Sequence, residues 1–249
     1  MDRRNKIIGI VALAYTITWL LILLFNLNFF TNGFINRLPW LYRVTSHMSY
    51  ILIFWLIVFG ITRFVGRQSW LGRFVDNNVV MGSLTLYSTM LFVYGVVSTG
   101  AGYSPMFSSE FRFWAIASNI LTYFGAFILM WTLFLLNERK APQLWSIFVM
   151  LIYPVVYFIV NMIVGHTVKW AHKLGVLPEK PSAFCPDCLP PATDGYPAFA
   201  YPFLNPAIYS HIGFFILAMI GALCFLVLVA FTLIKIKQKQ INDLHKRSK

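Results

Sequence analysis

Residues Ile212–Ile234 read IGFFILAMIGALCFLVLVAFTLI and contain no charged side chain. The hydrocarbon core of a bilayer is about 30 Å thick, and a helix needs about 20 apolar residues to cross it. This stretch therefore predicts one membrane-spanning helix. Lys235 follows directly and begins a basic C-terminal tail.

Five other apolar stretches lie upstream. They are Ile7–Phe30, Val44–Ile61, Val79–Val97, Phe113–Leu136 and Leu144–Val164. With 59% hydrophobic and 11% charged residues, the chain differs from soluble domains, in which about a quarter of the residues are charged. We expect an all-α polytopic membrane protein, a single domain over residues 1–249. It has six transmembrane helices and one long loop, residues 165–211, between the fifth and the sixth.

The basic residues predict the orientation of these helices. Fourteen of the 20 Lys and Arg residues fall in the termini and in the loops on the same side, and six fall on the other side. Because basic loops stay in the cytoplasm, we expect both termini there, the long loop outside, and the protein in the cell membrane. The net charge of +12 is spread over tails and loops, which favours membrane lipids as partners and not nucleic acid. The tail, residues 235–249, is predicted either to continue as a helix on the lipid surface or to be solvated.

The acidic residues exclude one class of function. None of the eight lies in a predicted span. Carboxylates within spans are the usual groups of proton and sodium pathways, so this distribution argues against an ion-coupled pump. The sequence also lacks a P-loop, a zincin motif and a kinase motif, so an ATP-driven role would need a partner chain. No cofactor is indicated by these patterns.

The long outer loop gathers groups that bind metals. Cys185 and Cys188 form a Cys-x-x-Cys pair, and His166, His172 and His211 lie in or beside the loop. Thiolates and imidazoles are the ligands of tetrahedral zinc, so Cys185 and Cys188 are candidate metal ligands. A disulfide between them is an alternative, because thiols outside the cytoplasm oxidise. The third interpretation is side chains without a chemical role at the headgroup interface.

Polar residues form stripes on several predicted helices. Gly82, Thr85 and Thr89 share one face of the third. Stripes of small and hydroxylated residues usually mediate helix packing. The alternative is a polar pocket that opens outward and binds a ligand. Its candidate binding residues are Asn119, Thr122, Tyr123, Tyr157, Asn161 and Tyr201.

Two short motifs carry a family resemblance. Tyr153–Tyr157 reads YPVVY in the fifth predicted helix, and Tyr201–Asn205 reads YPFLN just before the sixth. This pattern resembles the androgen-induced-gene family of six-helix membrane proteins and its bacterial relatives. Animal members hydrolyse fatty-acid esters of hydroxy fatty acids with a threonine at the start of the second helix and a histidine in the fourth. The resemblance implies a hydrolase with Thr45 as nucleophile, while Thr122 or Tyr123 occupies the region of the family's histidine.

A threonine hydroxyl needs a base to accept its proton. His166 and His211 are the candidate bases, because both are predicted at the same outer face as Thr45. The first hypothesis is therefore a lipid-ester hydrolase or acyl-handling protein with an outward-facing site. The alternatives are a non-enzymatic binder or transporter of a small solute or lipid, and a structural membrane subunit.

Overall fold

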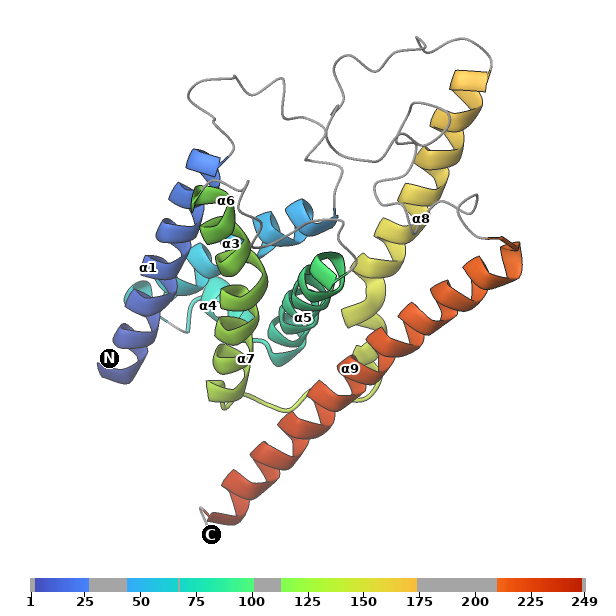
Figure 1. The fold of residues 1–249 in the computed structure, drawn as a ribbon. Helices are drawn as coiled ribbons and strands as arrows, with labels where there is room; N and C mark the ends of the chain where they lie inside the picture. The colour runs from blue at the N-terminus through green and yellow to red at the C-terminus, as the bar shows by residue number, and fades with distance from the viewer. Residues whose placement is uncertain (1–2, 27–43, 67, 101–112, 174–209, 248–249) are drawn as a thin grey trace. The chain divides into compact units, whose positions relative to one another are not determined.

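The computed structural model describes residues 3–26, 44–66, 68–100, 113–173 and 210–247, and all regular secondary structure in these residues is helical (Figure 1). The elements are α1 (Arg3–Asn26), α3 (Val44–Val65), α4 (Trp70–Val75), α5 (Asn78–Gly100), α6 (Phe113–Asn119), the π-helix η2 (Ile120–Gly125), α7 (Ala126–Leu136), α8 (Ser146–Lys173) and α9 (Ile212–Arg247). The expected all-α fold is confirmed for this part of the chain.

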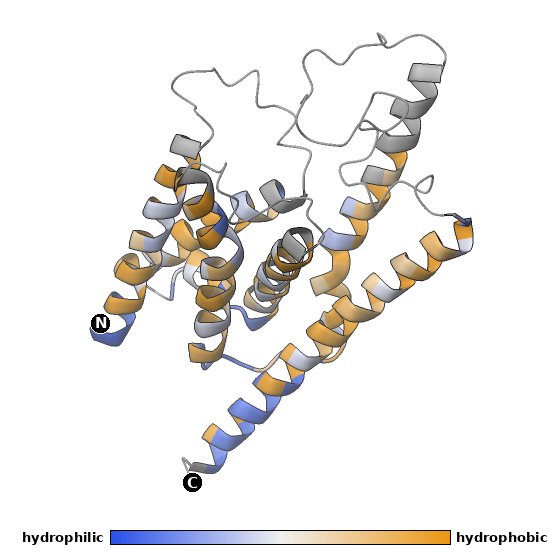
Figure 2. Ribbon diagram, in the orientation of Figure 1, coloured by the Kyte–Doolittle hydropathy of each residue, from blue (hydrophilic) through white to orange (hydrophobic). Residues whose placement is uncertain are grey.

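Five of the described helices are long and apolar enough to cross a membrane. The qualifying segments are Arg3–Leu23, His47–Val65, Asn78–Val97, Ile116–Leu136 and Ile212–Lys246. Within α8 the apolar segment is shorter, Ser146–Val160. Figure 2 shows that most of these helices are hydrophobic over most of their length, whereas the first turn of α1 and the last turns of α9 are hydrophilic. The chain therefore has the helices of a membrane protein, and the count of six spans stays a prediction.

The chain divides into two compact units. The first comprises Met1–Thr31, Met48–Met150 and Leu228–Lys249, and the second comprises Asn32–His47 and Leu151–Val227. Within the first unit, α5 packs against α7 and η2, and α1 packs against α6 (Figure 1). Its core is made of large apolar side chains with almost no exposed surface: Trp19, Met48, Leu52, Leu56, Met81, Leu86, Leu91, Met130 and Phe134.

Hydroxyl groups support the contact between α5 and α7. Trp131 Nε1 donates a hydrogen bond to Thr89 Oγ1 at 3.0 Å. Thr85 Oγ1 donates to the Met81 carbonyl oxygen at 2.7 Å and lies 3.4 Å from the Met130 carbonyl oxygen. Such bonds satisfy hydroxyl groups where water is excluded. The stripe that holds Thr85 and Thr89 therefore packs against α7.

The fourth predicted helix, residues 113–136, contains a π-helical turn. α6 continues into η2 and η2 into α7, with helical backbone angles at both junctions. Tyr15 Oη donates to the Leu121 carbonyl oxygen at 2.6 Å, and Trp19 Nε1 donates to Thr122 Oγ1 at 2.9 Å. A π turn shifts carbonyl groups out of the regular α pattern, so that side chains of a neighbouring helix can bind them. These bonds attach α1 to the middle of this helix.

Two helices extend beyond the predicted ends of their spans. α8 continues through Gly165 to Lys173, so the first residues of the predicted loop are helical. α9 continues from its apolar segment to Arg247, so the described part of the tail is helical, and its place on a lipid surface stays a prediction. The 36 residues of α9 rise about 54 Å, more than the roughly 30 Å hydrocarbon core. If its apolar segment crosses a membrane, the basic last turns reach beyond the hydrocarbon.

Candidate functional site

The predicted catalytic residues are only partly described. Thr45 lies in the first turn of α3 and His166 near the end of α8, and both side chains lie outside the described residues. His211 is exposed, and its ring centroid is 6.1 Å from that of Phe214. The hydrolase hypothesis, which needs Thr45 beside a histidine, stays a prediction. The described residues likewise do not include Tyr201, Cys185, Cys188 or the side chain of Asn161.

The zinc hypothesis likewise stays open at the two loop cysteines. Among the residues that the structure describes, no group of three or more His, Cys, Asp or Glu side chains is arranged to hold a metal ion. The proposed ligands Cys185 and Cys188 lie outside the described residues, within 174–209.

The predicted binding residues that are described make packing contacts. Thr122 is buried and accepts its hydrogen bond from a tryptophan of α1. Asn119 and Tyr123 are half-buried, and the Tyr123 ring contacts an aromatic ring of α5. In the other unit, Tyr157 packs edge-on against His47, with 5.7 Å between ring centroids. These contacts favour the packing interpretation of the polar stripes.

A buried ion cluster lies at the ends of α3 and α4. Asp76, the C-cap of α4, is only 1% exposed. Both terminal nitrogens of Arg63 donate to its carboxylate, Nη1 to Oδ2 at 3.4 Å and Nη2 to Oδ1. Arg139 Nη2 lies 3.5 Å from Asp76 Oδ2, and the Arg63 guanidinium lies 3.9 Å from the centroid of the Phe59 ring. Because a buried charge needs a partner, one carboxylate fixes two guanidinium groups here.

Two asparagines fix the turn that follows α7. Asn137 ends the helix with an extended backbone, and its Nδ2 donates to the Asp76 carbonyl oxygen at 2.8 Å and to Asn78 Oδ1 at 2.9 Å. Asn78 Nδ2 donates in turn to two carbonyl oxygens of residues 139 and 140, at 2.8 and 3.1 Å. These bonds hold the turn against the start of α5, and they place Arg139 beside Asp76.

Lys237 of α9 joins the same end of the first unit and is fully buried. Its Nζ donates to the carbonyl oxygens of Phe134 and Asn137, the latter at 2.8 Å, and lies 3.4 Å from that of Leu135. The last carbonyl groups of a helix have no partner within it and carry a partial negative charge. The ammonium group therefore neutralises the end of α7 and attaches α9 to it.

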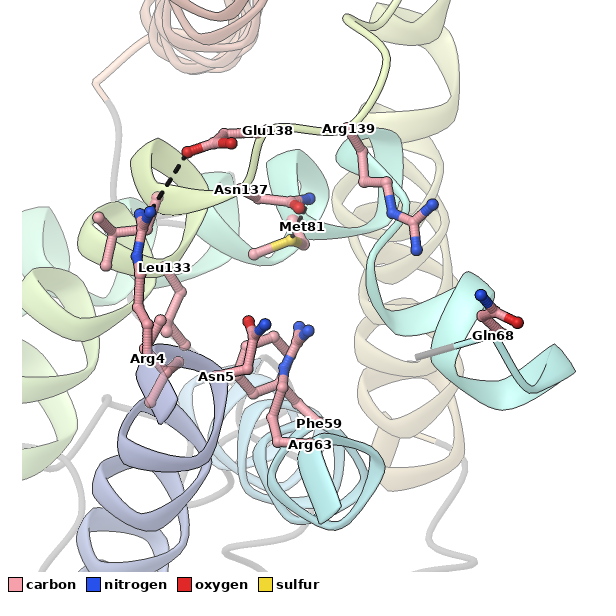
Figure 3. A pocket seen from close by; sticks show the side chains of 12 residues that line it. Arg4, Asn5, Phe59, Arg63, Gln68, Met81, Leu133, Asn137, Glu138 and Arg139 are labelled. Atoms are coloured by element: carbon pink, nitrogen blue, oxygen red, sulfur yellow. Dashed lines mark hydrogen bonds and ion pairs between the residues drawn. The ribbon is translucent and has the colours of Figure 1, made fainter. Parts of the chain in front are cut away.

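A cavity of about 400 Å³ opens among these groups, and we call it the basic cavity. Figure 3 shows Arg4, Arg63 and Arg139 around it, and a 3.4 Å ion pair joins Arg4 Nη1 to Glu138 Oε1. Glu138 is the one carboxylate among the lining residues, and the buried Asp76 carboxylate pairs with Arg63 and Arg139. Counted against these two carboxylates, the three arginines leave an excess of one positive charge. The cavity also has an apolar wall formed by Ile8, Phe59, Leu133 and Leu136.

A second cavity, of about 370 Å³, shares a wall with the first. Arg139 lines both, and the second also receives the basic side chains of Arg73 and Lys140. Positive charge therefore extends from α1 to the turn after α7.

Sequence reasoning treated Arg63, Arg139 and Lys237 only as charges that set topology. Their positions also indicate contacts at helix ends, because each residue lies within about one helical turn of the end of an apolar segment. Asp76 likewise lies just before the apolar segment that begins at Val79. Charges so placed are candidates for polar contacts between helix ends, although the sequence does not say which pair.

Comparisons of the chain with family models, with curated proteins and with solved structures found no match. The described residues define an all-helical protein with five helices suited to crossing a membrane. The resemblance to the androgen-induced-gene family stays an expectation from two motifs.

Proposed function

We propose that this protein is a six-span protein of the cell membrane, with both termini in the cytoplasm, that binds a phosphate-bearing lipid through the basic cavity. The observation that carries the proposal is the meeting of Arg4, Arg63 and Arg139 at one cavity that also has an apolar wall. Among the functions considered from the sequence, this is a non-enzymatic binder, but its site differs from the outward-opening pocket between the polar stripes that the sequence suggested.

The charge of the cavity supports an anionic ligand. One positive charge is left after Glu138 and Asp76 are counted against the three arginines. A guanidinium group presents paired N–H donors that match two phosphate oxygens. The side chains of Arg4 and Arg139 are 54% and 47% exposed, so they remain accessible to a ligand while Arg63 stays paired with Asp76.

The apolar wall supports an amphiphilic ligand. Ile8 lies on α1 and Leu136 on α7, both within helices suited to crossing the membrane, and the Leu136 side chain is 41% exposed. A headgroup in the cavity would leave its acyl chains beside this surface. The basic side of the chain is the predicted cytoplasmic side, and anionic lipids concentrate in that leaflet. These features favour a lipid phosphate over free phosphate.

The test is lipid binding by the purified full-length protein, measured by native mass spectrometry with dioleoyl phosphatidylglycerol. The variant Arg4→Gln/Arg139→Gln removes the two accessible charges and leaves the Arg63–Asp76 pair in place. Each half-exposed arginine contributes about 0.7 kcal/mol after discounting for solvent, so we expect about tenfold weaker binding.

The matched control is Lys239→Gln/Lys246→Gln, which removes two exposed charges from α9. We expect it to bind phosphatidylglycerol within about twofold of the unmodified protein, because neither lysine lines the basic cavity. Equal losses in the two double variants would show that binding follows net charge alone and would overturn the proposal.

Competition with inorganic phosphate tests whether the cavity prefers a lipid phosphate or free phosphate. If millimolar phosphate displaces the lipid completely, the lipid is not the preferred source of the phosphate group.

A further inference from the structure

Resting on the proposed function, we infer that the basic cavity recognises a phosphodiester headgroup with a free hydroxyl group, such as glycerol or inositol, and that the Asn137 side-chain oxygen accepts the hydrogen bond of that hydroxyl. The arginines select the phosphate. Asn137 distinguishes headgroups by whether the alcohol esterified to the phosphate has a free hydroxyl group.

Asn137 carries a buried acceptor in the wall of the cavity. Its side chain lines the cavity and is 5% exposed, and Figure 3 shows its amide close to Met81. Among the residues that the structure describes, Oδ1 has no hydrogen-bond partner. A buried acceptor without a donor is costly, and folded proteins normally satisfy such a group. An unsatisfied acceptor such as Asn137 Oδ1 at the wall of a cavity therefore points to a ligand that supplies the donor.

The hydrogen bonds around the amide fix which of its atoms is the free one. Asn78 Nδ2 donates to two backbone carbonyl oxygens at 2.8 and 3.1 Å, so Asn78 Oδ1 faces Asn137. Asn137 Nδ2 then donates to that oxygen at 2.9 Å and to the Asp76 carbonyl oxygen at 2.8 Å. Exchanging the oxygen and nitrogen of Asn137 would place an acceptor against two acceptors. The atom left to the ligand is therefore the oxygen.

The chemistry of common headgroups narrows the ligand. Choline has no N–H or O–H group to donate. Ethanolamine donates, but its ammonium group would add a positive charge beside three arginines with an excess of one. A polyol headgroup donates without charge, and its phosphodiester carries one negative charge, which is attracted to the positive excess of the cavity. The combination of arginines with an amide oxygen thus fits a hydroxylated anionic headgroup.

The experiment leaves the protein unchanged and compares two anionic lipids, one whose headgroup carries hydroxyl groups and one whose headgroup is a methyl group. Dioleoyl phosphatidylglycerol and dioleoyl phosphatidylmethanol carry the same charge and acyl chains. Binding of each to the purified full-length protein is measured by native mass spectrometry at equal lipid concentration. We expect about fivefold tighter binding of phosphatidylglycerol, the effect of one neutral hydrogen bond.

Each result decides one point. Equal, arginine-dependent binding of the two lipids would overturn the hydroxyl contact while the proposed function stands. Failure of both lipids to bind would overturn the proposed function and this inference with it. Tight binding of free sn-glycerol 1-phosphate, but not of methyl phosphate, would support the hydroxyl contact and overturn the lipid as its source.

A variant provides an independent readout. Asn137→Leu removes the acceptor, and we expect it to bind phosphatidylglycerol and phosphatidylmethanol equally. Because this change also removes the bonds of Nδ2, its thermal unfolding is measured in parallel. A folded variant that keeps the fivefold preference would overturn the assignment to Asn137.

Discussion

Replacing Lys237 with methionine tests how α9 is attached to the rest of the first unit. The change keeps most of the side-chain volume and removes the ammonium group, which is fully buried and contacts the carbonyl oxygens of Phe134 and Asn137. Loss of a donor costs about 1 kcal/mol for each of the two carbonyl groups, and loss of the charge at the end of α7 costs about 0.5–1 kcal/mol. Removing the ammonium group also removes the free-energy cost of burying it, which offsets part of this loss of stability. We expect a net loss of about 2 kcal/mol in the free energy of unfolding.

The assay is unfolding of the purified protein in mixed micelles, followed by tryptophan fluorescence. Hydrogen exchange at the end of α7 and over the last turns of α9 locates the loss. The matched control is Lys235→Met, because Lys235 is exposed and its Nζ lies 5.4 Å from the centroid of the Phe231 ring. We expect this control to lie within about 0.5 kcal/mol of the unmodified protein. Equal stability of the two variants, with unchanged exchange at both helix ends, would refute the attachment of α9 through Lys237.

Two further substitutions probe the ion cluster and the π turn. Asp76→Asn leaves Arg63 buried beside an uncharged group, so we expect a loss of about 3–5 kcal/mol in the same unfolding assay, whereas Glu138→Gln, at an exposed pair, costs less than about 1 kcal/mol. Similar losses in the two would contradict the account of the buried pair. Gly125→Ala places a Cβ atom 2.8 Å from Tyr15 Oη, so we expect a loss of about 1–3 kcal/mol. If Tyr15→Phe, which removes that oxygen, restores none of the loss, the close contact is not its cause.

The helices were predictable from sequence because the length of an apolar run is a local property. The run that begins at Ile212 is the start of α9, and the third predicted span, Val79–Val97, lies within α5. The exact ends were less predictable. α9 continues through its basic residues to Arg247, since lysine and glutamine favour helix and no proline or glycine stops it.

The basic cavity was not predictable, because its groups come from segments far apart in the chain. Arg4 lies 134 residues before its partner Glu138, and Arg63 lies on α3, between them in the sequence. An apolar pattern shows that a segment is buried in lipid or protein, but it does not show which helix end lies beside which. The sequence gives the charge of each group and leaves its partner undetermined.

The outward-facing site remains a prediction at its most important residues. Thr45 and His166 are helical, and the distance between their side chains decides whether a threonine nucleophile has a base. Incubation with a fluorophosphonate probe and a lipid-ester panel, with and without Thr45→Ala, tests that hypothesis independently of the basic cavity.

The most direct test of the central claim is photocrosslinking with a phosphatidylglycerol analogue that carries a diazirine on the acyl carbons nearest the headgroup. With the headgroup in the basic cavity, the reactive carbons lie beside its apolar wall. The account predicts adducts on Ile8, Leu133 and Leu136 that disappear with excess unlabelled phosphatidylglycerol. Adducts spread evenly over the exposed apolar faces of the helices, or confined to the basic turns of α9, would contradict it.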